Sequence, residues 1–135
     1  MTTYSHNFIT RKVSGNVPAY RLVKESDNGT VVLNGADTLP YGAVTEAGSE
    51  TNEKNKPQYL RVSTAQGVVP VELADGADLA SAKSGATLYA AADGKVDAKG
   101  TVAVGILDVP FEHAASTDTR GVKTARVHLF HPAAK

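Results

Sequence analysis

The side chains with the widest chemical range in this sequence are four histidines: His6, His113, His128 and His131. If His128 and His131 lie in one strand, they point to opposite faces and cannot share a metal ion, because side chains alternate along a strand. Glu112 stands beside His113, but no third ligand accompanies them, and the zinc-binding pattern H-E-x-x-H is absent. We therefore predict that the chain has no metal site.

The sequence lacks the partner residues that a catalytic nucleophile requires. A catalytic serine requires a histidine base and an orienting acid, and the G-x-S-x-G elbow is missing from the chain. Ser5 and His6 are adjacent, but nothing in the surrounding sequence would hold them in a fixed geometry. Cysteine and the glycine patterns that bind phosphate are also absent. The sequence predicts that the protein is not an enzyme and uses no cofactor.

One stretch resembles a motif that builds the uracil site in trimeric dUTPases, where glycine, aspartate and an aromatic residue are spaced as Gly105, Asp108 and Phe111 are here. The glycine expected two residues further on is replaced by His113, and the Arg-Ser-Ser segment of that family is missing. We interpret the stretch as a buried strand that ends at Asp108 and leaves its sheet at Pro110.

The balance of charge argues against nucleic acid as a partner. The chain has 14 Lys and Arg against 14 Asp and Glu, so its formal net charge is zero. Binding to a phosphate backbone needs a surplus of basic side chains on one face. No apolar run approaches the roughly 20 residues of a membrane span, and residues 1–11 lack the apolar core of a secretory signal. We expect neither nucleic acid nor a membrane as a partner.

The elements that position these side chains are predicted to be short strands separated by turn residues. The strand candidates are residues 20–24, 30–33, 41–45, 59–63, 67–73, 87–91, 95–97, 101–107 and 124–130. Asn28-Gly29 and Asp93-Gly94 predict tight hairpins, because both pairs accept positive φ angles. Strands 59–63 and 67–73 are expected to form a pair, and Pro70 places the second of them at a sheet edge or bulge.

Two other segments have distinct patterns. Residues 75–84 are the one plausible helix, which would stop at Gly85. Residues 48–56 are polar and charged and predict an exposed loop. Together with the strands, these features predict an all-β fold, either a small barrel or a sandwich, with at most one short helix.

The chain is predicted to consist of an arm and one domain. Residues 1–16 have loosely spaced apolar side chains and end in the breaker cluster Ser14-Gly15-Asn16, which favours an extended N-terminal arm. Disorder of this segment in the free protein is the alternative that the sequence leaves open. Residues 17–135 contain no linker and no convincing repeat of 20–50 residues, so we predict a single barrel domain.

The segment of residues 85–107, GATLYAAADGKVDAKGTVAVGIL, resembles the C-terminal half of small bacteriophage head decoration proteins. In those families a strand that opens with glycine, a small polar residue and an apolar pair is followed by an Asp-Gly hairpin. The next strand then reads like Val-Ala-Val-Gly-Ile-Leu. A closing strand such as residues 126–130 and an upstream element such as residues 40–44 also fit the lambda-type decoration proteins and related phage structural proteins.

The resemblance implies a β-tulip-like barrel, usually a homotrimer, that is made in the host cytoplasm and binds the outer surface of the expanded phage head. It would clamp subunits of the major capsid protein against the pressure of the packaged DNA. The N-terminal arm of such proteins commonly contacts the capsid. The arm residues expected to do so here are Tyr4, His6, Phe8, Ile9, Arg11 and Lys12.

Two other functions remain open. One is a different phage or host binding module, such as a head-fibre base or a carbohydrate-binding β-sandwich, although the chain has no Trp to serve as a sugar platform. The other is an enzyme on a small trimeric barrel, which would need a cluster of Asp, His and Tyr at a subunit interface. If the arm hypothesis is correct, removal of residues 1–13 leaves the barrel folded and abolishes capsid binding.

Overall fold

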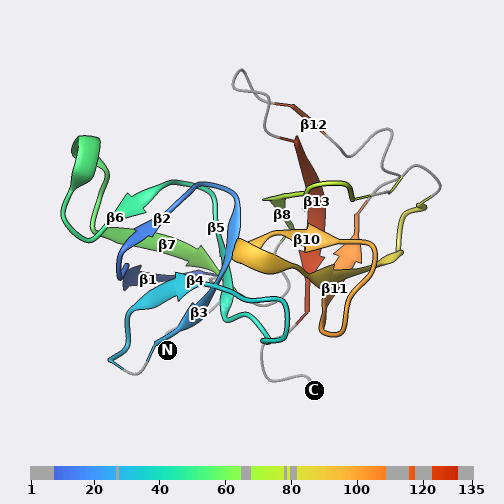
Figure 1. Ribbon diagram of the computed structural model, residues 1–135, viewed down its shortest axis with the longest axis horizontal. Coiled ribbons are helices and arrows are strands. Elements are labelled where there is room, and N and C mark those ends of the chain that lie inside the picture. Colours follow the sequence, from blue (N-terminus) through green and yellow to red (C-terminus); the bar gives the residue numbers. More distant parts are fainter. Residues whose placement is uncertain are drawn as a thin grey trace, which may run out of the picture.

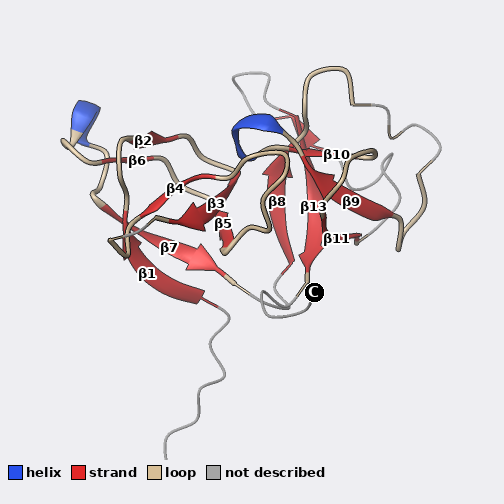
Figure 2. Ribbon diagram, turned by 60° about the horizontal axis from the view of Figure 1, so that its bottom comes forward, coloured by secondary structure: helices blue, strands red, loops and turns tan. Residues whose placement is uncertain are grey.

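The computed structural model describes residues 8–26, 28–64, 68–77, 79, 82–108, 116–117 and 123–130 of the 135-residue chain. In this part of the chain the regular elements are strands and two single 3-10 turns, η1 (Glu53–Asn55) and η2 (Ala92–Gly94). Figure 2 shows strands in both halves of the fold, joined by loops, with helix confined to short turns. The all-β prediction is therefore confirmed, and the curling of the sheets described below gives the fold a barrel-like form.

The first sheet, which we call the N-terminal sheet, consists of five antiparallel strands. They are β1 (Phe8–Lys12), β3 (Arg21–Glu25), β4 (Val31–Leu33), β5 (Gly42–Val44) and β7 (Tyr59–Ser63), in the spatial order β1-β7-β5-β3-β4. The sheet curls until Val13, directly after β1, forms a parallel bridge with Val31 of β4. A small ribbon of β2 (Asn16–Val17) and β6 (Gly48–Ser49) lies beside it (Figure 1).

The second sheet, which we call the C-terminal sheet, is built in the same way. Its strands are β8 (Val68–Glu72), β9 (Thr87–Ala90), β10 (Val96–Asp97), β11 (Ala103–Leu107) and β13 (Lys123–Leu129), in the order β8-β13-β11-β9-β10. The short strand β12 (Ser116–Thr117) pairs with the start of β13. Leu73, directly after β8, forms a parallel bridge with Val96 of β10. Figures 1 and 2 show the two sheets side by side.

The two sheets repeat one topology in one register. Strands β1, β3, β4, β5 and β7 correspond in order to β8, β9, β10, β11 and β13. The pairs that run from Phe8↔Ser63 to Lys12↔Tyr59 in the first sheet match those from Val68↔His128 to Glu72↔Thr124 in the second. Equivalent residues are thus 60 positions apart in β1 and β8 and 65 apart in β7 and β13. The described chain is therefore an internal duplication of one sheet topology.

A glycine at the same place in each sheet confirms the correspondence. A Cβ atom on Gly42 of β5 would lie 2.3 Å from Ser63 O, and one on Gly105 of β11 would lie 2.4 Å from His128 O. The next contacts are again equivalent, 2.7 Å to Val62 Cγ1 and 2.8 Å to Val127 Cγ1. Both sheets therefore need a residue without a side chain where the fourth of the five strands in chain order, β5 or β11, lies against the fifth, β7 or β13.

Each sheet encloses an apolar core. The core of the N-terminal sheet consists of Val13, Val17, Val23, Val31, Val44, Leu60 and Val62. The core of the C-terminal sheet is larger and includes Leu22 of β3 and Ala43 of β5, from the outer face of the N-terminal sheet. β3 is therefore buried on both faces, since Leu22 belongs to one core and Val23 to the other. The outer face of the first sheet covers the open side of the second.

Residues 8–16 differ from the predicted arm, because residues 8–12 form β1 of the N-terminal sheet and Asn16 begins β2 of the small ribbon. β1 pairs with β7 along all five of its residues, and the Val13 side chain is fully buried. Ser14 N–H then donates to Val31 O at 3.0 Å. The sequence concealed this strand because Arg11 occupies a core-facing position between Ile9 and Val13, which breaks the apolar alternation. Residues 1–7 of the predicted arm lie outside the described part of the chain.

The predicted helix at residues 75–84 is wrong over the residues described there. Ala77 N–H donates to Ala74 O and Ala82 N–H to Leu79 O, so the backbone makes separate turns. Leu79 is the one large apolar side chain of this segment, and it is buried in the C-terminal core, with Ala77 and Ala82 partly buried against that core. A helix here would have no apolar stripe with which to pack.

Two predictions about neighbouring segments need correction. Strands β7 and β8 do not pair with each other, since β7 lies between β1 and β5 whereas β8 pairs with β13. Pro70 does lie on an edge strand, because β13 is the one described strand that pairs with β8. In the predicted loop 48–56, Gly48 and Ser49 are buried in β6, while residues 50–55 are exposed. Gly48 fits there because a Cβ would meet Leu60 Cδ1 at 2.8 Å.

Candidate functional site

The residues predicted to contact a capsid fall into two groups. Tyr4 and His6 lie outside the described residues, and the other four, Phe8, Ile9, Arg11 and Lys12, are all on β1. Because side chains alternate along a strand, Ile9 and Arg11 share the face of Val13, which is the core face, and Lys12 lies on the opposite face. The structure therefore divides the predicted contact residues between two surfaces.

Besides its two faces, β1 presents an outer edge. Val13 N–H donates to Gln58 O at 2.8 Å, so the main-chain groups of Arg11 and Ile9 also point toward β7. Those of Phe8 and Thr10 then point the other way, where no described strand pairs with β1. We call the main chain of Phe8 and Thr10 the free edge of β1. Its N–H groups can donate hydrogen bonds to a further strand, and its C=O groups can accept them.

The core-facing residues Ile9 and Arg11 lie at the open end of the N-terminal sheet, which we call the mouth and define by Ile9, Arg11, Glu25 and Tyr41. Arg11 Nε lies 3.4 Å from Glu25 Oε2, and Arg11 Nη2 donates to Tyr41 Oη at 3.2 Å. The guanidinium carbon is 5.5 Å from the centre of the Tyr41 ring, within the range of a cation–π contact. Ile9 remains 39% exposed beside this group.

The equivalent opening of the C-terminal sheet is apolar and closed. Register places Val69, Val71 and Ala90 at the positions of Ile9, Arg11 and Glu25, and all three are buried. The side chains that close it there are Leu22 and Ala43 of the other sheet. The mouth thus differs from its counterpart in polarity and in exposure.

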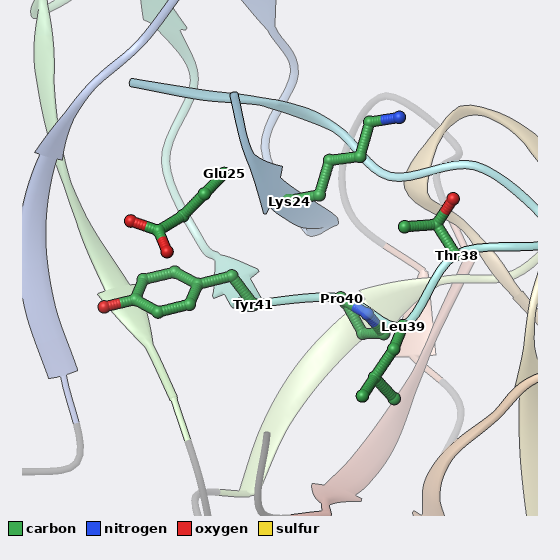
Figure 3. Close-up of a pocket in the computed structure, with 6 residues that line it drawn as sticks. All are labelled: Lys24, Glu25, Thr38, Leu39, Pro40 and Tyr41. Atoms are coloured by element: carbon green, nitrogen blue, oxygen red, sulfur yellow. The ribbon is translucent and has the colours of Figure 1, made fainter. Parts of the chain in front are cut away.

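An open depression of about 290 Å³ lies next to the mouth (Figure 3). Its lining residues are Lys24, Glu25, Thr38, Leu39, Pro40 and Tyr41. Asn34 holds the loop that forms one wall, since its Nδ2 donates to Gly35 O at 2.9 Å and to Thr38 O at 2.8 Å. The lining offers one ammonium and one carboxylate but no nucleophile with a neighbouring base, so its chemistry suits contact with a partner better than a reaction.

A cluster of three charges that sequence reasoning missed lies between the two sheets. Arg21 Nη2 and Nε donate to Glu72 Oε1 at 3.0 and 3.1 Å, and Lys95 Nζ lies 3.2 Å from Glu72 Oε2. The three side chains are only 13–18% exposed. Arg21 and Glu72 are 51 residues apart in sequence, so no local pattern could have revealed the pair. The mutual pairing makes this cluster a junction between sheets rather than a reactive site.

The Asp-Gly turn of the C-terminal sheet completes this junction, and Figure 2 shows η2 where the sheets meet. Gly94 N–H donates to Asn34 O at 2.8 Å, and Arg21 Nη1 donates to Asp93 O at 2.9 Å. A Cβ on Gly94 would lie 2.5 Å from Leu22 O. The equivalent glycine of the first sheet, Gly29, has a similar φ of +80° but no atom within 4 Å of such a Cβ.

This pair of glycines separates the cost of backbone strain from the cost of losing the junction. We expect Gly29→Ala to lower the free energy of unfolding by about 1 kcal/mol, because alanine resists the left-handed conformation. Gly94→Ala should cost about 3 kcal/mol, because the same strain is joined by a clash with the backbone of β3. Urea denaturation followed by circular dichroism measures both values. Equal losses would show that the turn does not pack as described.

The other candidate residues either make contacts within the fold or lie outside the described part of the chain. Asp108, from the dUTPase-like stretch, pairs with Arg126 Nη2 at 3.1 Å and also donates its N–H to Arg126 O. His128 is on β13 opposite Ile106, whereas His6, His113 and His131 are outside the described residues. Over the residues that are described, no group of three or more His, Cys, Asp or Glu side chains could hold a metal ion.

Comparisons with known proteins add no relative. No protein-family model matches the chain, and no curated protein matches it. In the described segments, no helix is long and apolar enough to cross a membrane. The surfaces that the chain itself presents, the free edge of β1 and the mouth, are therefore the starting point for its function.

Proposed function

We propose that the protein is a structural virion protein, a decoration or cement protein that binds the outer surface of a bacteriophage head and stabilises the expanded capsid. The observation that carries the proposal is the free edge of β1, which lies where the predicted capsid-binding segment joins the fold. Unpaired N–H and C=O groups on a sheet edge are a template for a strand from another protein. The partner in this proposal is the major capsid protein.

The outer face of β1 and β7 extends the contact surface. Lys12 is exposed and lies opposite Tyr59, whose ring is 58% exposed. Tyrosine is enriched in protein interfaces, where the ring supplies area and the hydroxyl supplies a hydrogen bond. A capsid surface can thus bind main chain at Phe8 and Thr10 and side chains at Lys12 and Tyr59.

The segment that carries the family resemblance supports the same proposal. Residues 85–107 form β9, the Asp-Gly turn, β10 and β11, and the turn makes the junction between the two sheets. A protein that holds capsid subunits together has to resist deformation, and the paired charges and shared core of the junction supply rigidity. In this proposal the fold is of the β-tulip-like kind, and three copies act together so that weak single contacts add up.

The test uses substitutions at Thr10, whose N–H belongs to the free edge. Thr10→Pro removes that donor and should weaken binding to expanded heads at least tenfold, because a hydrogen bond and the approach of a strand are both lost. The change is compatible with the fold, since Pro70 occupies the equivalent position of β8 in the same register. Removal of residues 1–7 should likewise reduce binding. Co-sedimentation with expanded heads measures the occupancy.

Thr10→Ala is the matched control, because it shortens the side chain and keeps the N–H group. It should bind heads almost as well as the unaltered protein. If Thr10→Pro reaches full occupancy, the free edge is not the contact surface. If Thr10→Ala loses as much binding as Thr10→Pro, the side chain rather than the edge makes the contact.

A further inference from the structure

Comparison of the two sheets shows that the mouth lacks the cover that closes its counterpart in the C-terminal sheet. At Ile9 the exposed fraction is 39%, whereas its equivalent Val69 is 6% exposed. The side chains of Arg11 and Glu25 are 32% and 42% exposed, whereas their equivalents in the C-terminal sheet belong to the core. The same architecture is therefore covered in one sheet and uncovered in the other.

The cover of the C-terminal sheet is a specific pair of side chains. Leu22 and Ala43 lie opposite each other on β3 and β5, on the outer face of the N-terminal sheet, and both are fully buried in the neighbouring core. The equivalent pair on the outer face of the C-terminal sheet is Thr87 and Ile106, which lie opposite each other on β9 and β11. Thr87 is exposed and Ile106 is partly exposed. Thr87 and Ile106 thus lie where Leu22 and Ala43 lie in the other sheet, but in the described chain they do not cover the open side of another sheet.

A main-chain hydrogen bond between the two sheets also has an equivalent that is not made within the chain. Within the chain, Glu72 N–H donates to Tyr20 O at 2.8 Å, where Tyr20 has the unusual φ of 62°. The equivalent of Glu72 is Lys12, whose N–H points to the outer edge of β1. The equivalent of Tyr20 is Gly85, which also has a positive φ, 93°, and is exposed. The donor and the acceptor of a second such bond thus lie at opposite ends of the molecule.

We infer that a second copy of this chain covers the mouth with the β9–β11 face of its C-terminal sheet. Thr87 and Ile106 of one copy lie over Ile9, Arg11, Glu25 and Tyr41 of the next, and Gly85 O accepts from Lys12 N–H. The contact repeats between chains the one that already joins the two sheets within a chain. It is head-to-tail, so it builds a ring or an open filament rather than a two-fold dimer.

This self-association goes beyond capsid binding and does not depend on it. The free edge of β1 stays available, because Val68 and Pro70, the equivalents of Phe8 and Thr10, have β13 as their one described strand partner and do not pair with the N-terminal sheet. The contact between chains is weaker than the internal one, since Ala86 and Lys12 replace Arg21 and Glu72 and remove the ion pair. Assembly should therefore depend on protein concentration.

The test uses one variant on each side of the contact. Ile9→Lys places a charge in the mouth, and Thr87→Lys places one on the covering face, where the residue is exposed and its replacement leaves the core intact. Size-exclusion chromatography with light scattering should give a mass at least twice the 14.1 kDa chain for the unaltered protein and 14.1 kDa for each variant. Thr51→Lys, in the exposed turn after β6, is the matched control and should keep the larger mass.

Mixing the two variants distinguishes head-to-tail contact from any other. Each variant retains the surface that the other has lost, so the mixture should form a one-to-one dimer and nothing larger. A monomeric unaltered protein, variants that keep the larger mass, or a mixture that stays monomeric would each overturn the inference. If Ile9→Lys does not fold, Glu25→Lys provides a second change in the mouth at a more exposed position. Capsid binding is scored separately, so failure of one proposal does not decide the other.

Discussion

Removal of residues 1–13 is expected to unfold the N-terminal sheet, whereas removal of residues 1–7 should leave it folded. The longer deletion takes away β1, which pairs with β7 along five residues, and Val13, which is fully buried and bridges to Val31. Burial of a valine side chain alone contributes about 1.5–3 kcal/mol. With the strand pairing added, the loss is on the order of 5 kcal/mol, comparable with the whole stability of a small domain.

Thermal unfolding followed by circular dichroism distinguishes the two deletions. The protein without residues 1–7 should melt cooperatively near the temperature of the full chain. The protein without residues 1–13 should show no cooperative transition or a strongly lowered one. A cooperative and unshifted melt for the longer deletion would mean that residues 8–13 are an appendage after all. Loss of capsid binding on removal of residues 1–13 would therefore report unfolding and could not identify a contact.

The second large effect is expected at the paired glycines Gly42 and Gly105. Alanine at either position would place a Cβ within 2.4 Å of a carbonyl oxygen on the neighbouring strand, and that oxygen belongs to the backbone and cannot move aside. Each substitution should lower the free energy of unfolding by about 3 kcal/mol, the upper range for overpacking in a protein core. Because the two sites are equivalent, the two losses should be similar.

Gly35→Ala is the control for this pair. The nearest atom to a Cβ at Gly35 is Thr38 Oγ1 at 3.8 Å, an ordinary contact, so the change should alter the stability by less than about 1 kcal/mol. Chemical denaturation of the three variants measures the differences. A Gly105→Ala protein as stable as the Gly35→Ala protein would show that β11 and β13 do not approach as closely as described.

Local sequence patterns were sufficient to predict most of the strands and both hairpins. The Asn28-Gly29 and Asp93-Gly94 turns do connect antiparallel strands, and residues 59–63 are a strand over the predicted range. These predictions succeeded because turn residues and β-branched runs act over a few positions. The all-β class followed from the same signals.

The duplication could not be found in that way. Among equivalent strand and hairpin positions, the identical residues are Gly29 and Gly94, Val31 and Val96, Gly42 and Gly105, Arg61 and Arg126, and Val62 and Val127. The remaining equivalent positions differ, among them Ile9 and Val69, where one sheet exposes its opening and the other buries it. The spacing of 60–65 residues also exceeds the repeat lengths usually sought. Sheet pairing, the charge cluster and the mouth all depend on contacts distant in sequence, and no local pattern encodes them.

The burial of Leu22 and Ala43, two residues of the N-terminal sheet, in the C-terminal core gives the chain a direction of folding during synthesis. Every member of the N-terminal core lies between Val13 and Val62, so that sheet has all its parts before β8 leaves the ribosome. The C-terminal core needs Leu22 and Ala43 as well as its own strands. In a nascent chain the N-terminal sheet can therefore fold first, and the C-terminal sheet folds second against it. The larger apolar core of the C-terminal sheet then emerges next to Leu22 and Ala43, which cover it.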